Sequence, residues 1–443
     1  MRNAQGGGSS VDSEQPEDSS KVNDPMGPRA GSMSRGYARR RELRQDDPGF
    51  DLECRVGRVE FAEGALVRLR VPVRAEAEAG RDVLTDLDVV AVDVDSRLRF
   101  GRSILECKSG KGQSKEPDRL LWLSGLRAYM RGPRAVLVRQ TISARGRLMA
   151  RRLGIEAMDT KQLSQLEAAV SWVPDRFAHV GGAECALAEK RTDEQIQGLG
   201  YIDTGTVGFL RHDALFADPL TILVQLMQLG SVTADQGSLP VPANFTVGGH
   251  ALMALLLAAL SDAQRLDVMP REMLKDKIER ALTVGGSDAG DLLTVLESAD
   301  NLFGHVVESL HDAYVSVSGV GKIDVDVPKL LDLVAVPPIW VDRYLDLVES
   351  LRANGSISSQ LLQTAELSVF EGLAGGDKHL YSSFDHLFTV EHRQLLRLAV
   401  LTLTKITGSV ITEGLEGISN MPFDRHRPAV PDRRGNPERS KGL

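Results

Sequence analysis

The chain has 443 residues, of which 42% are hydrophobic and 26% charged, and its formal net charge is −8. This size and composition suffice for two or three buried cores and exclude a small disulfide-stabilised domain. Its three cysteines, Cys54, Cys107 and Cys185, are too few and too scattered for a disulfide framework or a zinc site, which suits a reducing compartment. The N-terminus lacks the apolar stretch of a secretion signal, so we expect a cytoplasmic protein.

Both ends of the chain are poor in the apolar side chains that a folded core needs. Residues 1–46 are rich in Gly, Ser, Asp and Glu and are predicted to be a disordered leader, whose basic end at 35–44 could contact nucleic acid or be only solvated. Residues 424–443 are rich in Pro, Arg and Gly and are predicted to be a flexible tail. Between them we expect two domains, at 47–170 and 171–423.

The first of these domains alternates between helical and strand patterns. In chain order we expect helix 50–60, strand 65–74, strands at 84–93 and 104–109, helix 118–130, strand 134–139 and helix 143–153. The dipeptide Gly132-Pro133 ends the second helix. The order of elements is therefore α-β-β-β-α-β-α.

Charged side chains interrupt the two apolar strands in the middle of this domain. Side chains two apart share a face of a strand, so Asp86 and Asp88 point together on one strand, and Glu106 and Lys108 on the next. If the strands pair, three carboxylates and one amine meet at one edge of the sheet. Carboxylate oxygens suit Mg²⁺ or Mn²⁺, and a lysine beside the ion can orient water and offset charge on a phosphate. The pattern indicates a phosphodiester-cleaving centre.

This arrangement resembles the PD-(D/E)xK, or restriction-endonuclease-like, superfamily of nucleases. Within it, the chain is most similar to the "ELDVV…ECKT" pattern of nuclease domains in prokaryotic defence proteins. The resemblance implies an α/β core, a mixed sheet flanked by helices, over about residues 48–168. It also implies that Asp88 and Glu106 hold the metal, that Lys108 is catalytic, and that Asp86 stands where the pattern has a glutamate. A further glutamate on the first helix, Glu53 or Glu60, could contribute.

The charge distribution agrees with binding to a polyanion. Between Arg97 and Lys161 there are sixteen Lys and Arg against five Asp and Glu, a net charge of +11 that leaves −19 on the rest. For the four arginines of the predicted helix 143–153, two interpretations stay open: they contact a nucleic-acid backbone, or they form an ordinary solvated helix face. The residues best placed to contact nucleic acid follow the motif directly; they are Lys111, Lys115 and Arg119.

The second domain is predicted to be mainly α-helical and acidic. The helices are expected at 220–229, 249–266, 272–283, 291–314, 339–353, 359–373 and 390–407. The apolar run His250–Leu260 is about half as long as a membrane span and is interpreted as a buried helix. The nine histidines, His179 among them, show no metal-binding spacing and are interpreted as ordinary core or surface residues.

Together these features predict a Mg²⁺- or Mn²⁺-dependent nuclease that acts on nucleic acid, preferably DNA, with a role in defence against foreign nucleic acid implied by the resemblance. The alternative is a catalytically silent nucleic-acid-binding or scaffold subunit that acts through its helical domain. That domain could bind a partner subunit, form a homo-oligomer or gate the nuclease.

Overall fold

The structure is a computed structural model that describes residues 48–74, 83–110, 116–130, 132–170, 173–284, 290–321, 338–375 and 381–421. The predicted leader and tail lie outside the described residues, as do Lys111 and Lys115. The described part belongs to one compact unit that extends from Asp46.

A five-stranded mixed sheet forms the first part of the fold. Its strands are β1 (Leu66–Arg74), β2 (Val83–Val94), β3 (Phe100–Lys108), β4 (Arg134–Arg139) and β5 (Glu156–Asp159), in that spatial order. The pairs β1/β2 and β2/β3 are antiparallel, whereas β3/β4 and β4/β5 are parallel. The predicted mixed α/β architecture is confirmed, with β5 as a strand that the sequence pattern did not show.

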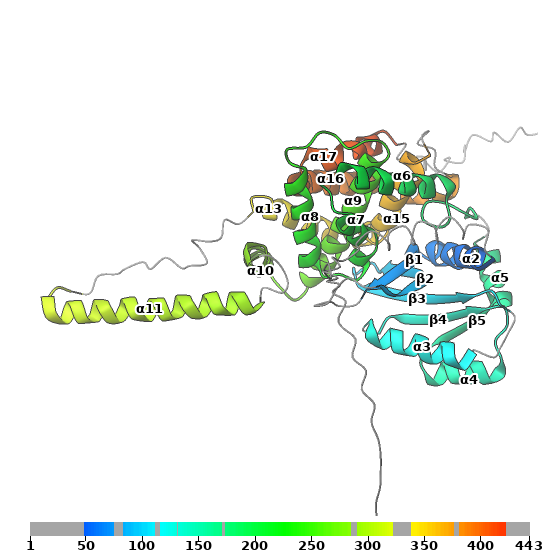
Figure 1. The fold of residues 1–443 in the computed structure, drawn as a ribbon, viewed down its shortest axis with the longest axis horizontal. Helices are drawn as coiled ribbons and strands as arrows, with labels where there is room; N and C mark the ends of the chain where they lie inside the picture. Colours follow the sequence, from blue (N-terminus) through cyan, green and yellow to red (C-terminus); the bar gives the residue numbers. More distant parts are fainter. Residues whose placement is uncertain are drawn as a thin grey trace, which may run out of the picture. The chain divides into compact units, whose positions relative to one another are not determined.

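Four helices accompany the sheet, namely α2 (Pro48–Ala62), α3 (Glu116–Tyr129), α4 (Ala144–Arg152) and α5 (Thr160–Ala169). Figure 1 shows α2 on one face of the sheet and α3 with α4 on the other. The predicted apolar stripe of α2, Leu52, Val56 and Val59, is buried. Because both faces are covered, β4 is buried at five of its six positions, as expected for a parallel strand.

Helices dominate the rest of the chain. They are α6 (Ala183–Leu199), α7 (Thr204–Arg211), α8 (Pro219–Thr233), α9 (Ala243–Arg265), α10 (Arg271–Val284), α11 (Gly290–Ser318), α13 (Val341–Ala353), α14 (Gly355–Ser358), α15 (Leu361–Glu366), α16 (Val390–Thr407) and α17 (Ser409–Thr412). The predicted mainly helical region is confirmed. The single helix expected at 359–373 is instead α15 followed by a π-helical segment, Leu367–Leu373. Helices α6 and α7 were not predicted, and α6 buries the polar residues Glu189 and Thr192, which weakens its apolar period.

Helix α9 is the centre of the helical part. It is long and apolar enough to cross a membrane, but 89% of its most apolar window is buried inside the protein. Helices α6, α8, α13 and α16 contact it. We therefore interpret α9 as a core helix, which confirms the reading of the run His250–Leu260.

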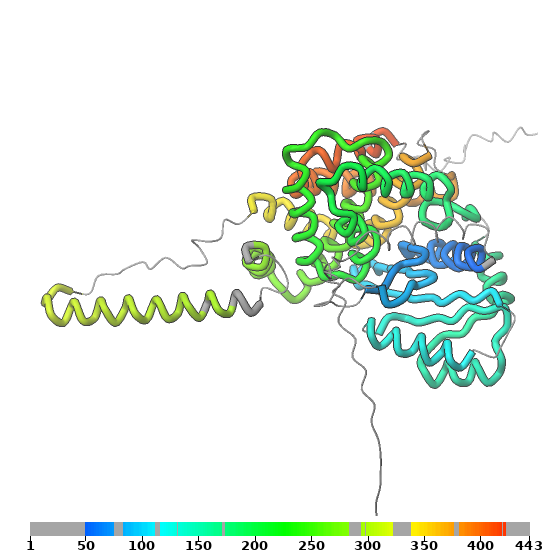
Figure 2. Tube along the Cα trace, in the orientation of Figure 1, coloured from blue at the N-terminus to red at the C-terminus, as the bar shows by residue number. Residues whose placement is uncertain are grey.

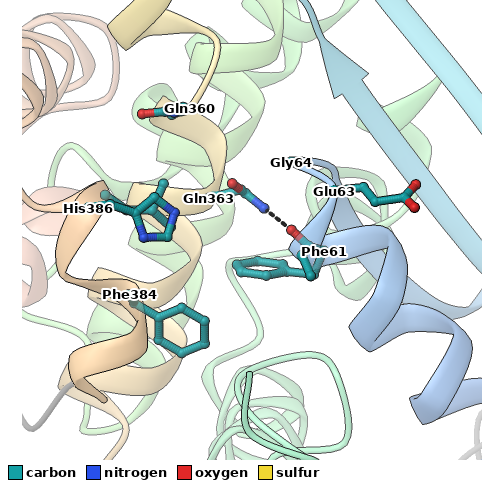
Figure 3. Close-up of a pocket in the computed structure, with 9 residues that line it drawn as sticks. Phe61, Glu63, Gly64, Gln360, Gln363, Phe384 and His386 are labelled. Atoms are coloured by element: carbon teal, nitrogen blue, oxygen red, sulfur yellow. Dashed lines mark hydrogen bonds between the residues drawn. The ribbon is translucent and has the colours of Figure 1, made fainter. Parts of the chain in front are cut away.

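The sheet and the helices share one hydrophobic core. Gln363 of α15 donates from Nε2 to the carbonyl oxygens of Phe61 (2.6 Å) and Ala65 (3.1 Å), at the end of α2. Figure 3 shows this bond beside a pocket that Phe384 and His386 also line. The colours of Figure 2 follow residue number, and α15 and β1 have colours far apart on its bar. The two elements are nevertheless in contact. The boundary at 170/171 stays a prediction, because the two parts pack together.

Candidate metal-dependent active site

The motif residues lie where β2 and β3 stop pairing. The antiparallel ladder runs from Val94 opposite Phe100 to Val89 opposite Leu105. Beyond it, Asp88 Oδ2 accepts a hydrogen bond from the backbone N–H of Cys107 at 2.8 Å. The side chain of Asp88 thus takes over the role of a ladder partner, and this bond fixes its position relative to β3.

Lys108 joins the two carboxylates. Its Nζ lies 2.8 Å from Asp88 Oδ2 and 2.6 Å from Glu106 Oε1. The side chains of Lys108, Asp88 and Glu106 are 33%, 19% and 4% exposed, so the cluster opens to solvent on the Lys108 side. Burial and the facing Asp88 raise the pKa of Glu106. Burial opposes the charge on Lys108, but the two carboxylates outweigh it and raise the lysine pKa.

Glu53 of α2 completes this environment. Burial raises the pKa of Glu53 to about 7, against the lowering effect of its bond to Arg70, and Asp88 and Lys108 also act on it. Arg70 donates from Nε to Glu53 Oε2 at 2.7 Å and lies with its guanidinium 4.6 Å from the centre of the Phe50 ring. The backbone of Arg70 has φ 56°, the left-handed region, which is costly for a residue with a side chain. The fold therefore holds a strained residue beside the motif.

The structure separates the two glutamates that the sequence left as alternatives. Glu60 accepts hydrogen bonds from Arg134 of β4 at 2.9 and 3.2 Å, and it also interacts electrostatically with Glu156 of β5. Glu53 interacts with Asp88 and Lys108 instead. Among the described residues, Asp86, Asp88 and Glu106 do not form a set whose ligand oxygens all lie within 4.8 Å of one another. The same holds for Glu53 with Asp88 and Glu106, so Asp86 stays a predicted ligand and Glu53 is a buried neighbour whose pKa responds to Asp88 and Lys108.

Basic side chains near the motif are partly used inside the protein. Arg119 lies 3.5 Å from Glu106 Oε1 and over the Trp122 ring, so it lies beside the site, and its contact with nucleic acid stays a prediction. Arg134 and Arg147 pair with carboxylates of the same part of the fold. Three arginines of α4 are exposed; they are Arg145, Arg151 and Arg152. The excess positive charge of this region is therefore only partly available to a ligand.

The donor set fits a hard divalent cation. Mg²⁺ usually takes one or two protein carboxylates and keeps several waters. Asp88 and Glu106 present oxygens to the same point, where the charge of Lys108 Nζ offsets theirs. The Glu106 side chain is 4% exposed, so it has little contact with water. Burial and, after it, the charge of Asp88 raise the pKa of Glu106, and a bound cation would act in the opposite direction.

Comparison with known proteins adds no relative to this description. No family model matches the chain, and no curated protein and no solved structure is significantly similar to it. The geometry of the side chains therefore carries the functional argument.

Proposed function

We propose that this protein is a metal-dependent nuclease of the restriction-endonuclease-like kind, with Asp88, Glu106 and Lys108 as its active site. One observation carries the proposal, namely that Lys108 Nζ lies within 2.8 Å of both carboxylates at the point where β2 and β3 separate. A structural role does not require two carboxylates and an amine to converge at a partly exposed strand end.

Each residue has a distinct part in the proposed reaction. Asp88 and Glu106 would hold Mg²⁺ or Mn²⁺, which when bound supplies an activated water and a positive charge against the phosphate. Lys108 donates hydrogen bonds towards the attacking water or a phosphate oxygen and stabilises the charge that grows there. Glu53, with its pKa near 7, is a proton acceptor of suitable strength beside this group.

Nucleic acid is the substrate class that these surroundings favour. Arg119 at the site and the exposed arginines of α4 supply positive charge in a chain that is acidic as a whole. DNA is the proposed substrate and defence against foreign nucleic acid the proposed setting; both depend on the motif resemblance. Lys111 and Lys115 complete the predicted contact surface.

The test compares wild-type protein with Lys108→Ala and with Lys161→Ala, which removes an exposed lysine of α5. Each is incubated with Mg²⁺, with Mn²⁺ or with EDTA on supercoiled plasmid, linear duplex, single-stranded DNA and RNA. We expect cleavage that needs the metal, that persists in Lys161→Ala and that falls by about 10³-fold or more in Lys108→Ala. Binding without cleavage of any substrate by the folded wild type would refute the proposal and leave the catalytically silent binding subunit.

A further inference from the structure

A second cluster of ionisable side chains lies where the helices meet the sheet, away from the proposed active site. His179 precedes α6, Glu189 lies on α6 and His250 on α9, and each offers a ligand atom within 4.8 Å of the other two. His250 Nε2 lies 2.6 Å and His179 Nε2 lies 3.4 Å from the same atom, Glu189 Oε1. Two imidazoles and one carboxylate oxygen thus converge at one buried point.

The fold holds the His179 imidazole with a defined nitrogen towards this point. Glu366 Oε1 accepts from Nδ1 of His179 at 2.7 Å and from its backbone N–H at 3.2 Å, so Nε2 of that ring faces Glu189. His179 Nε2 is buried and makes no hydrogen bond. A carboxylate on one ring nitrogen, with the other nitrogen turned towards the ion, is the arrangement that orients histidine ligands in metal sites.

Arginines hold the outer oxygens of the two glutamates. Arg68 of β1 lies 2.8 Å from Glu366 Oε2, and Arg211 pairs with Glu189 Oε2. Each carboxylate therefore keeps only Oε1 for the histidines. The guanidinium groups also balance the negative charge, so the cluster is not simply an acidic pocket.

The backbone before α6 is strained in a way that places His179. Ala178 has φ 40°, and its N–H donates to Glu371 Oε2 at 2.7 Å. Phe177 and Val180 exchange backbone hydrogen bonds across the turn. A Cβ at Gly182 would lie 2.7 Å from backbone atoms of Ala178, so the turn requires glycine there. Such strain is common at ligand sites.

We propose that His179, Glu189 and His250 bind a structural Zn²⁺ ion. Imidazole suits zinc, and Zn–N and Zn–O bonds of about 2.0–2.2 Å place neighbouring ligand atoms about 3.3 Å apart. The 3.4 Å between His179 Nε2 and Glu189 Oε1 matches this spacing, whereas the 2.6 Å between His250 Nε2 and Glu189 Oε1 is a hydrogen bond that the ion would replace by moving the two atoms apart. Among the described residues, the set whose ligand atoms all lie within 4.8 Å consists of His179, Glu189 and His250, so Cys185, one turn before Glu189 on α6, is not counted as a ligand. The burial of these side chains leaves no approach for a substrate, which makes the role structural.

The first test measures metal in the purified full-length wild type. Protein is prepared without a histidine tag or chelator, and zinc is quantified by inductively coupled plasma mass spectrometry. We expect one Zn²⁺ per chain and, after exchange into Co²⁺, visible absorption typical of a tetrahedral site with nitrogen and oxygen ligands. A folded wild type that retains no zinc and shows no thermal shift with added Zn²⁺ would overturn the proposal and leave a purely electrostatic cluster.

Variants then locate the ion. Glu366→Gln removes the carboxylate that orients His179, together with the charge that pairs with Arg68, and is expected to weaken zinc binding by about 10- to 100-fold. His392→Gln is the matched control for the loss of a buried polar side chain. His392 is as buried as Glu366 but lies on α16, with Thr389 as its partner. Asp88→Asn tests the other candidate metal site. Zinc content that falls with Asp88→Asn and not with Glu366→Gln would also overturn the proposal.

Discussion

The raised pKa of Glu53 makes the stability of this protein depend on pH in a predictable way. Burial raises the pKa of this carboxyl from 4.5 to about 7. Between these two values the unfolded chain has released the proton and the folded protein still binds it. The stabilising contribution is therefore complete below about pH 4.5 and is lost as the pH rises through about 7.

The magnitude follows from the two pKa values. A gap of about 2.5 between 4.5 and about 7, at about 1.4 kcal/mol for each unit, gives roughly 3 kcal/mol. Glu53→Gln keeps the shape but cannot titrate. We expect the free energy of unfolding of the wild type to fall by about 3 kcal/mol relative to that of Glu53→Gln between pH 4.5 and pH 8.

The assay is urea denaturation from pH 4.5 to 8 in the presence of EDTA, followed by circular dichroism. Glu167→Gln is the control, because Arg55 lowers the pKa of Glu167 and the pH dependence should have the opposite sign. Glu167 stabilises the fold above its unfolded pKa, and this contribution is lost on acidification. If the free energy of unfolding changed with pH in the same way in wild type and Glu53→Gln, the conclusion that burial raises the pKa of Glu53 would be refuted.

Two further predictions concern stability. A Cβ at Gly146 would lie 1.4 Å from Oε1 of the buried Glu116, so Gly146→Ala should cost about 1–3 kcal/mol in thermal denaturation. Gly125 of α3 has no atom within 4 Å of a Cβ, so Gly125→Ala should stabilise by about 1 kcal/mol; equal effects at the two glycines would contradict the packing. Arg68→Ala leaves Glu366 buried without its cation and should cost about 3–5 kcal/mol in chemical denaturation, whereas a loss under 1 kcal/mol would show that water reaches the pair.

Local sequence pattern was sufficient for the elements around the motif. The two-residue period of a strand places Glu106 and Lys108 on one face, and it needs no information about distant residues. The same holds for the stripe of α2 and for the uniformly apolar core of α9, whose burial was predicted correctly. Strand and helix periods are properties of neighbouring residues, so these features are encoded in short segments.

Side-chain partners from distant segments could not be read in this way. Whether Glu53 or Glu60 lies beside the motif depends on the packing of α2 against β1 and β2, and the strained Arg70 that pairs with Glu53 has no sequence signal. The π-helical segment Leu367–Leu373 likewise has no signal in the local pattern; it and α15 both contact α9.

The sequence by itself therefore determined strands β1 to β4, the buried α9 and the strand residues of the candidate active site, because each depends on a short repeating pattern, whereas the mixed sheet was implied only by the motif resemblance. Only the tertiary structure decided the cluster of His179, Glu189, His250 and Glu366. Up to 187 residues separate the partners, and Glu189 lies within a helix whose buried polar residues conceal its inner face. The spacing rules for metal ligands describe sites built within one segment, whereas this cluster is assembled from a turn and three helices.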